Sequence, residues 1–423
     1  MRISTAPTCD PALRNRPAAR LQYGAGGYPC QVTSATQQLA PALAIDARLT
    51  EIERSLNLLL NVTPVNAAEA WADFERSDFA TVPTLRLRPL EFEPDLVRRD
   101  LYNLEVENVT DPALHTLFRT KRDEIARQIT ALEDRDTSRF TYGSLQLYGG
   151  IAQPLASAAE ELLETIPAQA PSTPSVTAGA FAEAARAEFD RYRAVYPDFP
   201  AHLEVRDDIS DLMVSFGRLL IPEAAAFRAD RVEPLLHHEV GTHVVTYVNG
   251  ARQPLTLLTI GLPGYDETQE GLAVLAEYLT GGLDPRRLRV LAARVVAVGM
   301  MLDGAGFGEI FESLRTEHQM PTRTAWSIAI RVVVGGGSVK DAIYLRGITR
   351  ILEALAEGLS LDALFVGKLA LDHVPLIQDL LDRDVLQGPW VHPRWLDVPG
   401  AQERLTRLRA GASVTDLYED VSA

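Results

Sequence analysis

Helical periodicity dominates the chain after about residue 40. In residues 113–135, ALHTLFRTKRDEIARQITALEDR, apolar side chains recur three and four positions apart, with charged residues between them. Residues at this spacing lie on one face of a helix, so the pattern predicts an amphipathic helix packed on a core. The side chains expected to face the core are Leu114, Leu117, Phe118, Ile125, Ile129 and Leu132.

Further helices and two strand-like runs follow in the second half of the chain. The runs HLEVRDD and DLMVSFGRLLIP combine β-branched and apolar residues, and the second stops at a proline, which predicts short strands. The predicted fold class is therefore α+β, predominantly α, with a small sheet. The helices expected around these strands span 180–194, 229–248 and 267–282.

Composition divides the chain into five segments. The first is rich in Pro, Gly, Arg and Thr without periodicity, and we expect a tail without regular structure. The sequence PAQAPSTPSVTAG reads as a connector. The expected order is a tail (1–40), a helical N-terminal region packed on the core (41–166), the connector (167–179), a main region (180–385) and a C-terminal arm (386–423).

Charge and cysteine content exclude several classes of protein. The net charge of −16 argues against a nucleic-acid binder or a protein of anionic membrane surfaces. The two cysteines, Cys9 and Cys30, cannot form a disulfide framework or a cysteine zinc cluster. The N-terminus has no apolar signal-peptide region, and no run of eighteen apolar residues exists to cross a membrane. We expect a cytoplasmic protein that binds neither nucleic acid nor membrane.

The segment LLHHEVGTHVVTY, residues 235–247, carries the first candidate chemistry. Imidazole is a common zinc ligand, and His238 and His243 lie on one predicted helix. The usual spacing of four leaves two such ligands about 40° apart around the helix, whereas a spacing of five leaves them about 140° apart. A single π-turn would realign positions five apart, and Gly241 lies where the backbone would have to distort. We therefore predict a π-like turn near Gly241.

A third ligand is available on the next predicted helix. Glu270 lies near its start, and a helix–loop–helix of this length can fold back to bring that carboxylate to the histidines. The alternative is a first-turn Glu that is favoured only by the helix dipole. Three protein ligands and one open position are typical of catalytic zinc. Glu239, beside the first ligand, would then act as general base on a metal-bound water. The strand LMVSFGRLLI would be the edge strand that holds an extended substrate.

The combination of HHEVGTHVVTYVNGARQPL and GLPGYDETQEGLAVLAEYL resembles the QEGLA-motif family, also labelled flavohaemoglobin-expression-modulating. Its animal members are the microtubule-associated tyrosine carboxypeptidases, which remove a terminal tyrosine from tubulin. The resemblance extends from about residue 45 to about 385 and includes RFTYGSLQLYGG and GGGSVKDAIYLRG. It implies a zincin-like metallopeptidase core in residues 180–385 and one Zn²⁺ on His238, His243 and Glu270, with Glu239 as base. The acidic composition and compact length do not indicate tubulin, itself acidic, as the substrate.

An exopeptidase that acts at a C-terminus also needs a cation for the terminal carboxylate, and the planar guanidinium of arginine suits it well. Candidates around the glycine turn are Arg331, Lys340 and Arg346. Tyr344 or Tyr265 could donate a hydrogen bond to the oxyanion of a tetrahedral intermediate.

The predicted function is a zinc-dependent carboxypeptidase whose substrate is a peptide or protein C-terminus. Two alternatives stay open. One is a non-catalytic regulatory or binding protein that contains zinc, although a structural site would have no need of Glu239. The other is a zinc amidohydrolase of a small non-peptide amide. The sequence gives no indication of the oligomeric state.

Overall fold

The computed structural model describes residues 34–418 except 83, 171–172 and 210. Its internal contacts divide the chain into residues 1–40 and a unit of residues 41–423. The expected N-terminal tail lies outside the described residues, apart from the first turns of helix α1. The fold below is that of the second unit.

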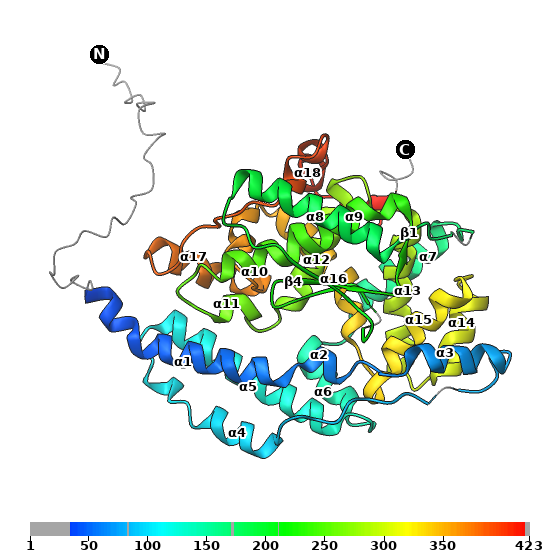
Figure 1. Cartoon of the computed structure of the whole chain (residues 1–423), viewed down its shortest axis with the longest axis horizontal. Coiled ribbons are helices and arrows are strands. Elements are labelled where there is room, and N and C mark those ends of the chain that lie inside the picture. Colours follow the sequence, from blue (N-terminus) through cyan, green and yellow to red (C-terminus); the bar gives the residue numbers. More distant parts are fainter. Residues whose placement is uncertain (1–33, 83, 171–172, 210, 419–423) are drawn as a thin grey trace, which may run out of the picture. The chain divides into compact units, whose positions relative to one another are not determined.

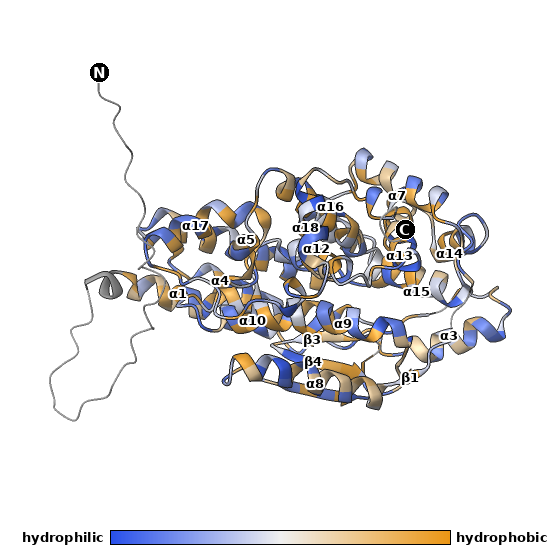
Figure 2. Cartoon of the chain, turned by 90° about the horizontal axis from the view of Figure 1, so that it is seen from above, coloured by the Kyte–Doolittle hydropathy of each residue, from blue (hydrophilic) through white to orange (hydrophobic). Residues whose placement is uncertain are grey.

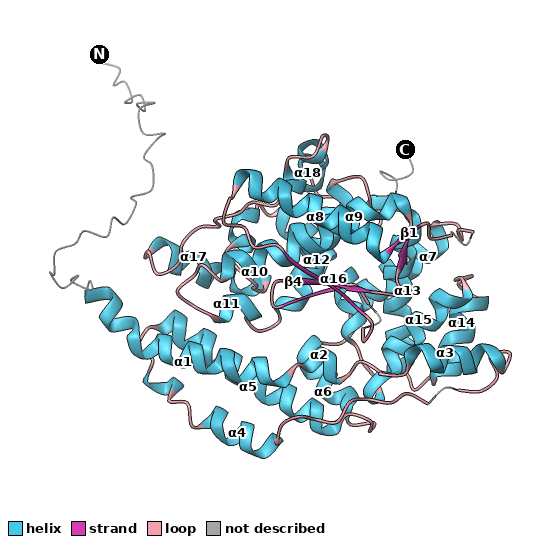
Figure 3. Cartoon of the chain, viewed as in Figure 1, coloured by secondary structure: helices cyan, strands magenta, loops and turns pink. Residues whose placement is uncertain are grey.

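Helices make up most of this unit, and the strands form two small sheets (Figure 3). The predicted class, α+β and mainly α, is confirmed at this level. The first half of the chain contains α1 (Ser34–Leu56), α2 (Leu58–Asn61), α3 (Ala67–Arg76), α4 (Pro94–Tyr102), η2 (Val106–Asn108), α5 (Pro112–Asp134), α6 (Phe140–Tyr148), α7 (Gln153–Thr165), β1 (Val176–Thr177), α8 (Ala178–Val195), β2 (His202–Arg206), β3 (Met213–Ser215), β4 (Arg218–Pro222), β5 (Ala226–Phe227) and η3 (Ala229–Arg231).

The second half is helical throughout its regular structure, as far as it is described (Figure 1). Its elements are α9 (Val232–His238), η4 (Glu239–Val244), α10 (Val245–Gly250), α11 (Leu257–Ile260), α12 (Tyr265–Leu279), α13 (Pro285–Leu302), α14 (Phe307–Thr316), α15 (Thr322–Val333), η5 (Val334–Gly336), η6 (Lys340–Ala342), α16 (Ile343–Ala356), η7 (Leu361–Phe365), η8 (Leu371–His373), α17 (Val374–Asp382), η9 (Arg394–Leu396) and α18 (Ala401–Arg409).

The amphipathic helix predicted at 113–135 is α5. Asp111 caps it, because its carboxylate accepts hydrogen bonds from the backbone amides of Ala113 and Leu114 at 3.0 and 3.1 Å, and Pro112 begins its first turn. All six side chains predicted to face the core are fully buried. The predicted packing of this apolar face against the core is therefore confirmed.

The larger sheet has the strand order β2-β4-β3. Strand β2 pairs with β4 in parallel, and β3 pairs with β4 in antiparallel fashion. The predicted edge strand is thus two strands: β3 lies at an edge, whereas β4 is central and four of its five residues are buried. Figure 2 shows β3 and β4 lying between α8 and the helix that begins with α9.

The turn between β3 and β4 contains two residues. Phe216 and Gly217 have φ angles of 47° and 75°, while Ser215 pairs with Arg218 on either side. Both central residues of such a tight hairpin need a positive φ, which suits glycine but strains a bulky side chain. Phe216 is nevertheless 44% exposed. The fold therefore holds a partly exposed aromatic side chain at a strained position.

Two glycines allow α12 and α16 to pack closely. A Cβ atom on Gly271 would lie 2.4 Å from the backbone carbon of Gly347, and one on Gly347 would lie 2.1 Å from the carbonyl oxygen of Glu267. The close approach explains why small residues follow Glu270 in the segment QEGLA. No helix among the described residues is long and apolar enough to cross a membrane.

Candidate metal and catalytic site

The histidine helix contains the predicted wide turn. Element η4 is a π-helix over Glu239–Val244, between the α-helices α9 and α10. A π-turn brings positions five apart onto one face, so His238 and His243 point to the same side. The centroids of the two rings lie 5.3 Å apart. The predicted π-like turn is confirmed.

The structure gives a different reason for glycine at position 241 from the distorted backbone that we expected. Its φ is not positive, so the backbone conformation does not demand glycine. A Cβ atom there would instead lie 2.7 Å from the Cδ1 atom of Trp395, and the Trp395 indole nitrogen donates a hydrogen bond to the Gly241 carbonyl at 3.2 Å. Trp395 is fully buried. The C-terminal segment therefore packs directly against the π-turn.

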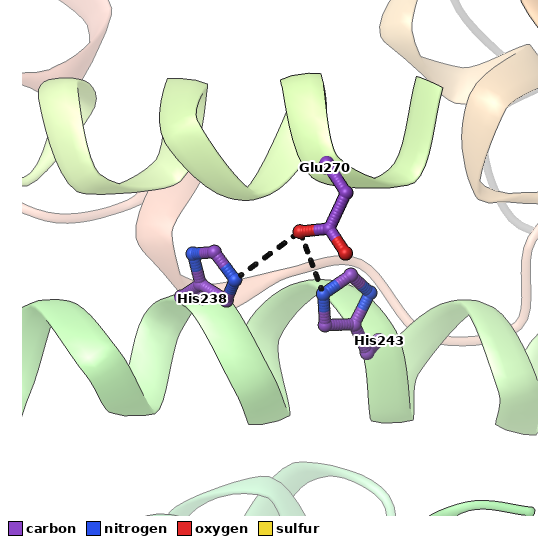
Figure 4. A group of neighbouring side chains, drawn as sticks. All are labelled: His238, His243 and Glu270. Carbon is purple, nitrogen blue, oxygen red and sulfur yellow. Dashed lines mark ion pairs between the residues drawn. The ribbon is translucent and has the colours of Figure 1, made fainter. Parts of the chain in front are cut away.

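Three side chains converge beside this turn, as Figure 4 shows. The Nε2 atom of His238 lies 3.6 Å from Oε2 of Glu270, and the Nε2 atom of His243 lies 3.8 Å from the same oxygen. One ligand atom from each residue lies within 4.8 Å of the others. Two zinc ligands in tetrahedral geometry are about 3.3 Å apart. Glu270 on α12 thus meets both histidines at a separation that one metal ion can bridge.

The ring of His238 is oriented by a buried carboxylate. Its Nδ1 donates to Oε1 of Glu277 at 2.8 Å, which leaves Nε2 directed at Glu270. Glu277 is itself paired with Arg231 at 2.6 Å and with Arg287 at 3.3 Å. Burial alone would lower the pKa of His238, but the carboxylates of Glu270, Glu277 and Glu239 raise it to about 9. A carboxylate behind a metal-binding imidazole fixes its tautomer in this way.

His243 is supported by an amide. Its Nδ1 lies 3.4 Å from the side-chain oxygen of Gln269, which also accepts a hydrogen bond from the Thr246 hydroxyl at 2.7 Å. Burial lowers the pKa of His243 to about 4. Burial would raise the pKa of Glu270, but the neighbouring imidazoles lower it to about 2. At neutral pH this pair therefore offers a neutral imidazole and an ionised carboxylate.

Glu239 lies at the start of the π-turn and its side chain is buried. Its Oε1 atom is 3.9 Å from Nε2 of His238, so it faces the converging ligands without bonding to them. Burial raises the pKa of Glu239 to about 7. A carboxylate with a pKa near neutrality can accept and return a proton.

Tyr344 lies near the same centre, on the first turn of α16. Its ring is 4.7 Å from the guanidinium of Arg294 and 5.7 Å from that of Arg287. Burial, followed by the negative charge of Glu270, raises its pKa to about 12. Tyr344 therefore keeps its phenolic proton at neutral pH.

The three predicted carboxylate-binding cations already have acidic partners. Arg331 makes two bonds to Asp341, at 2.7 and 2.8 Å. Lys340 is paired with Asp266. Arg346 is paired with Glu267, and it also donates to the carbonyl oxygens of residues 148 and 150. These pairs hold α12, α15, α16 and the end of α6 together.

A cavity of about 330 Å³ is lined by the edge strand and by the start of α12. Met213, Val214 and Ser215 of β3 line it, as do Tyr265 and other residues at the start of α12. Lys340 and Arg346 also line this cavity, whereas Arg331 does not. The predicted association of an edge strand with a cleft is therefore present, with β3 in that position.

Sequence reasoning missed three charged residues around this centre, the buried Glu277 and Lys368 and the half-buried Arg287. Glu277 had a detectable signal, because it follows Glu270 by seven residues and two helical turns return to the same face. Arg287 lies in the first turn of the next helix beside Arg286 and near Arg289, and nothing in that basic run distinguishes it from its neighbours. Lys368 follows a glycine in an irregular segment, where no periodicity indicates direction.

A known protein family matches most of the chain. The family model described as microtubule-associated tyrosine carboxypeptidase matches residues 72–413, well over half of the chain. No curated protein matches the sequence. The matched range includes the π-turn, the three converging side chains and Trp395. The chain belongs to the microtubule-associated tyrosine carboxypeptidase family.

Proposed function

We propose that the protein is a zinc-dependent carboxypeptidase. The observation that carries the proposal is the convergence of His238, His243 and Glu270 beside a fourth residue, Glu239, whose carboxylate faces them without joining them. Membership of a carboxypeptidase family supports a peptidase, and the side chains supply the means of hydrolysis.

The residues fit a zinc ion. Two imidazole nitrogens and one carboxylate oxygen are a known catalytic zinc ligand set, and such sites leave a position open for water. The Oε2 atom of Glu270 is buried and accepts no hydrogen bond from any described residue, which leaves it free for a cation. When bound, zinc would act as a Lewis acid on the scissile carbonyl and increase the acidity of a water molecule.

Glu239 would accept the proton of the attacking water and deliver it to the leaving amine. Its burial and its raised pKa favour both directions of transfer near neutral pH. Tyr344 would donate a hydrogen bond to the oxyanion of the tetrahedral intermediate, since it retains its proton. Its position near Glu270 supports this role.

The edge of β3 would bind the substrate backbone in extended form. Only one side of β3 is paired within the sheet, and its residues line the cavity. Main-chain hydrogen bonds along such an edge hold a peptide without regard to its sequence. The histidine helix packs against β3 and β4, and this arrangement supports the zincin-like core that the family resemblance implies.

The test is hydrolysis by the purified protein together with its metal content. We expect close to one equivalent of zinc, and release of single C-terminal residues from a peptide library read by mass spectrometry. Glu239→Gln should retain zinc and lose hydrolysis by at least about 100-fold. Glu233→Gln, an exposed neighbour on the same helix, is the matched control and should behave as the unmodified protein. Zinc below a tenth of an equivalent, or internal cleavage of the peptides, would refute the proposal.

A further inference from the structure

Lys368 is a buried cation without a carboxylate partner among the described residues. Lys368 is only 8% exposed. Its Nζ atom lies 5.7 Å from the centre of the Tyr265 ring, and its two hydrogen bonds are both made by its backbone. Burying an ammonium group without an anionic partner is costly. A residue maintained at this cost is a candidate for binding an anion that arrives from outside.

The backbone holds Lys368 in a fixed place. Its amide donates to the carbonyl of Leu258 at 2.9 Å, and its carbonyl accepts from the amide of Leu262 at 2.9 Å. The preceding Gly367 is packed so closely that a Cβ atom would lie 2.8 Å from the Leu258 side chain. These contacts fix the backbone at Lys368 and therefore the position of its Cα atom.

Other cations that line the same cavity are compensated or exposed. Lys340 and Arg346 pair with Asp266 and Glu267, and Arg206 pairs with Asp208 at 2.6 Å. Arg54 is exposed, and its one side-chain hydrogen bond in the described structure goes to the Thr259 hydroxyl at 3.4 Å. Lys368 is thus the buried cation of this cavity whose charge is least satisfied by neighbours.

Lys368 also interacts electrostatically with the carboxylates of the candidate site. It lines the cavity together with β3 and Tyr265. Burial lowers the pKa of Lys368, while the negative charges of Asp266, Glu270 and Glu239 oppose that effect, so both site carboxylates are within electrostatic reach. An anion bound at Lys368 would therefore act on the same group of charges as Glu239 and Glu270.

We propose that Lys368 binds the α-carboxylate of the peptide's C-terminal residue. The proposal rests on the carboxypeptidase function proposed above and names the residue that makes it an exopeptidase. A peptide aligned along β3 would end at Lys368, where its terminal carboxylate would neutralise the buried ammonium. A peptide that continued past this point would leave Lys368 buried and unpaired. The cation thus selects free C-termini over internal bonds.

The test compares matched peptides that end in a free carboxylate or in a carboxamide. The unmodified protein should prefer the acid in kcat/KM, and Lys368→Met should reduce kcat/KM for the acid by about 10- to 100-fold while sparing the amide. Lys368→Arg should keep much of the preference. Arg54→Gln removes one positive charge from the exposed rim of the same cavity, and it should leave the ratio of acid to amide unchanged.

Binding measured without turnover separates this proposal from the proposed function. In calorimetry with the zinc-loaded Glu239→Gln protein, the acid peptide should bind at least about 10-fold more tightly than the amide. Lys368→Met in that background should abolish the difference. Equal binding of the two peptides, an equal loss for both in Lys368→Met, or loss of the preference in Arg54→Gln would overturn the assignment. Absence of hydrolysis would refute the proposed function, whereas the assignment of Lys368 depends only on the binding measurement.

Discussion

Glu277 lies seven residues after Glu270 on α12, and its Oε1 atom accepts a hydrogen bond from Nδ1 of His238 at 2.8 Å. One face of α12 therefore supplies both a proposed metal ligand and the carboxylate that orients another ligand. Arg231 pairs with the other oxygen of Glu277, and Arg287 pairs with Oε1 itself. The fully buried charge of Glu277 is stable here because His238, Arg231 and Arg287 all pair with it.

Removing this carboxylate should weaken zinc binding. We expect Glu277→Gln to reduce zinc affinity by about 10- to 100-fold, because the His238 ring loses its charged acceptor and its fixed tautomer. The affinity is measured by competition with a chromogenic chelator at constant pH. Glu233→Gln on α9 is the matched control. An unchanged affinity in Glu277→Gln would mean that packing alone orients the imidazole.

Zinc affinity should depend on pH through His238. Its pKa is raised to about 9 in the protein alone, so the protonated imidazole and its carboxylates stabilise the fold below pH 6.5, and this contribution is lost as the pH rises through 9. Zinc must displace that proton. Between pH 7 and 9 the affinity should therefore rise by about 10-fold per pH unit and then level off.

The same chelator competition, repeated across that pH range, measures the slope. His243, with a pKa of about 4, and Glu270, with a pKa of about 2, release no proton in this window. A flat profile between pH 7 and 9 would contradict the displacement of a proton from His238 in this range. An affinity that rose by about 100-fold per pH unit would require a second ligand that releases a proton in this range.

The contact between Gly241 and Trp395 should be sensitive to a single methyl group. A Cβ atom at residue 241 would lie 2.7 Å from Trp395 Cδ1, so we expect Gly241→Ala to destabilise the protein by about 1–3 kcal/mol and to lower its zinc content. Denaturant unfolding and metal analysis measure the two effects. The double variant Gly241→Ala/Trp395→Leu should recover less than the full loss, because it also removes the indole hydrogen bond. A neutral Gly241→Ala would show that the indole ring moves freely.

Phe216 should contribute to substrate binding at a cost in stability. It has a φ of 47°, it is 44% exposed, and it lines the cavity, where Arg54 lies 5.8 Å from the ring centre. Phe216→Gly removes a backbone strain of about 1 kcal/mol, so stability should be retained or should increase. KM for peptide substrates should rise, since an aromatic surface at the rim of the cavity is lost. A large loss of stability with an unchanged KM would assign Phe216 to the core instead.

Local patterns were sufficient for the elements and for part of the site. The stripe on α5 and the pair of strands followed from periodicity, because side chains three and four apart, or two apart, share a face in any fold. The π-turn followed from the spacing of His238 and His243, since only a wide turn lets both imidazoles reach one ion. Membership of the family was also detectable from the segments around these residues.

Other features depend on contacts between residues distant in the chain. Trp395 reaches Gly241 across 154 positions, and no local signal relates them. Arg331, Lys340 and Arg346 were reasonable candidates for a free carboxylate until the fold supplied Asp341, Asp266 and Glu267 as partners. Whether a cation is free to bind an anion is a property of its neighbours.

The sequence by itself determined the two histidines, the turn that aligns them and the mainly helical class, because these depend on spacing along individual helices, and Glu270 on the next helix was identified through the family resemblance. Only the tertiary structure decided which charges are compensated. It placed Glu277 behind His238 and left Lys368 buried without a carboxylate in the described part of the chain. The physical reason is that the electrostatic energy of a buried charge is set by partners within a few ångströms, and the packing of distant segments brings those partners there.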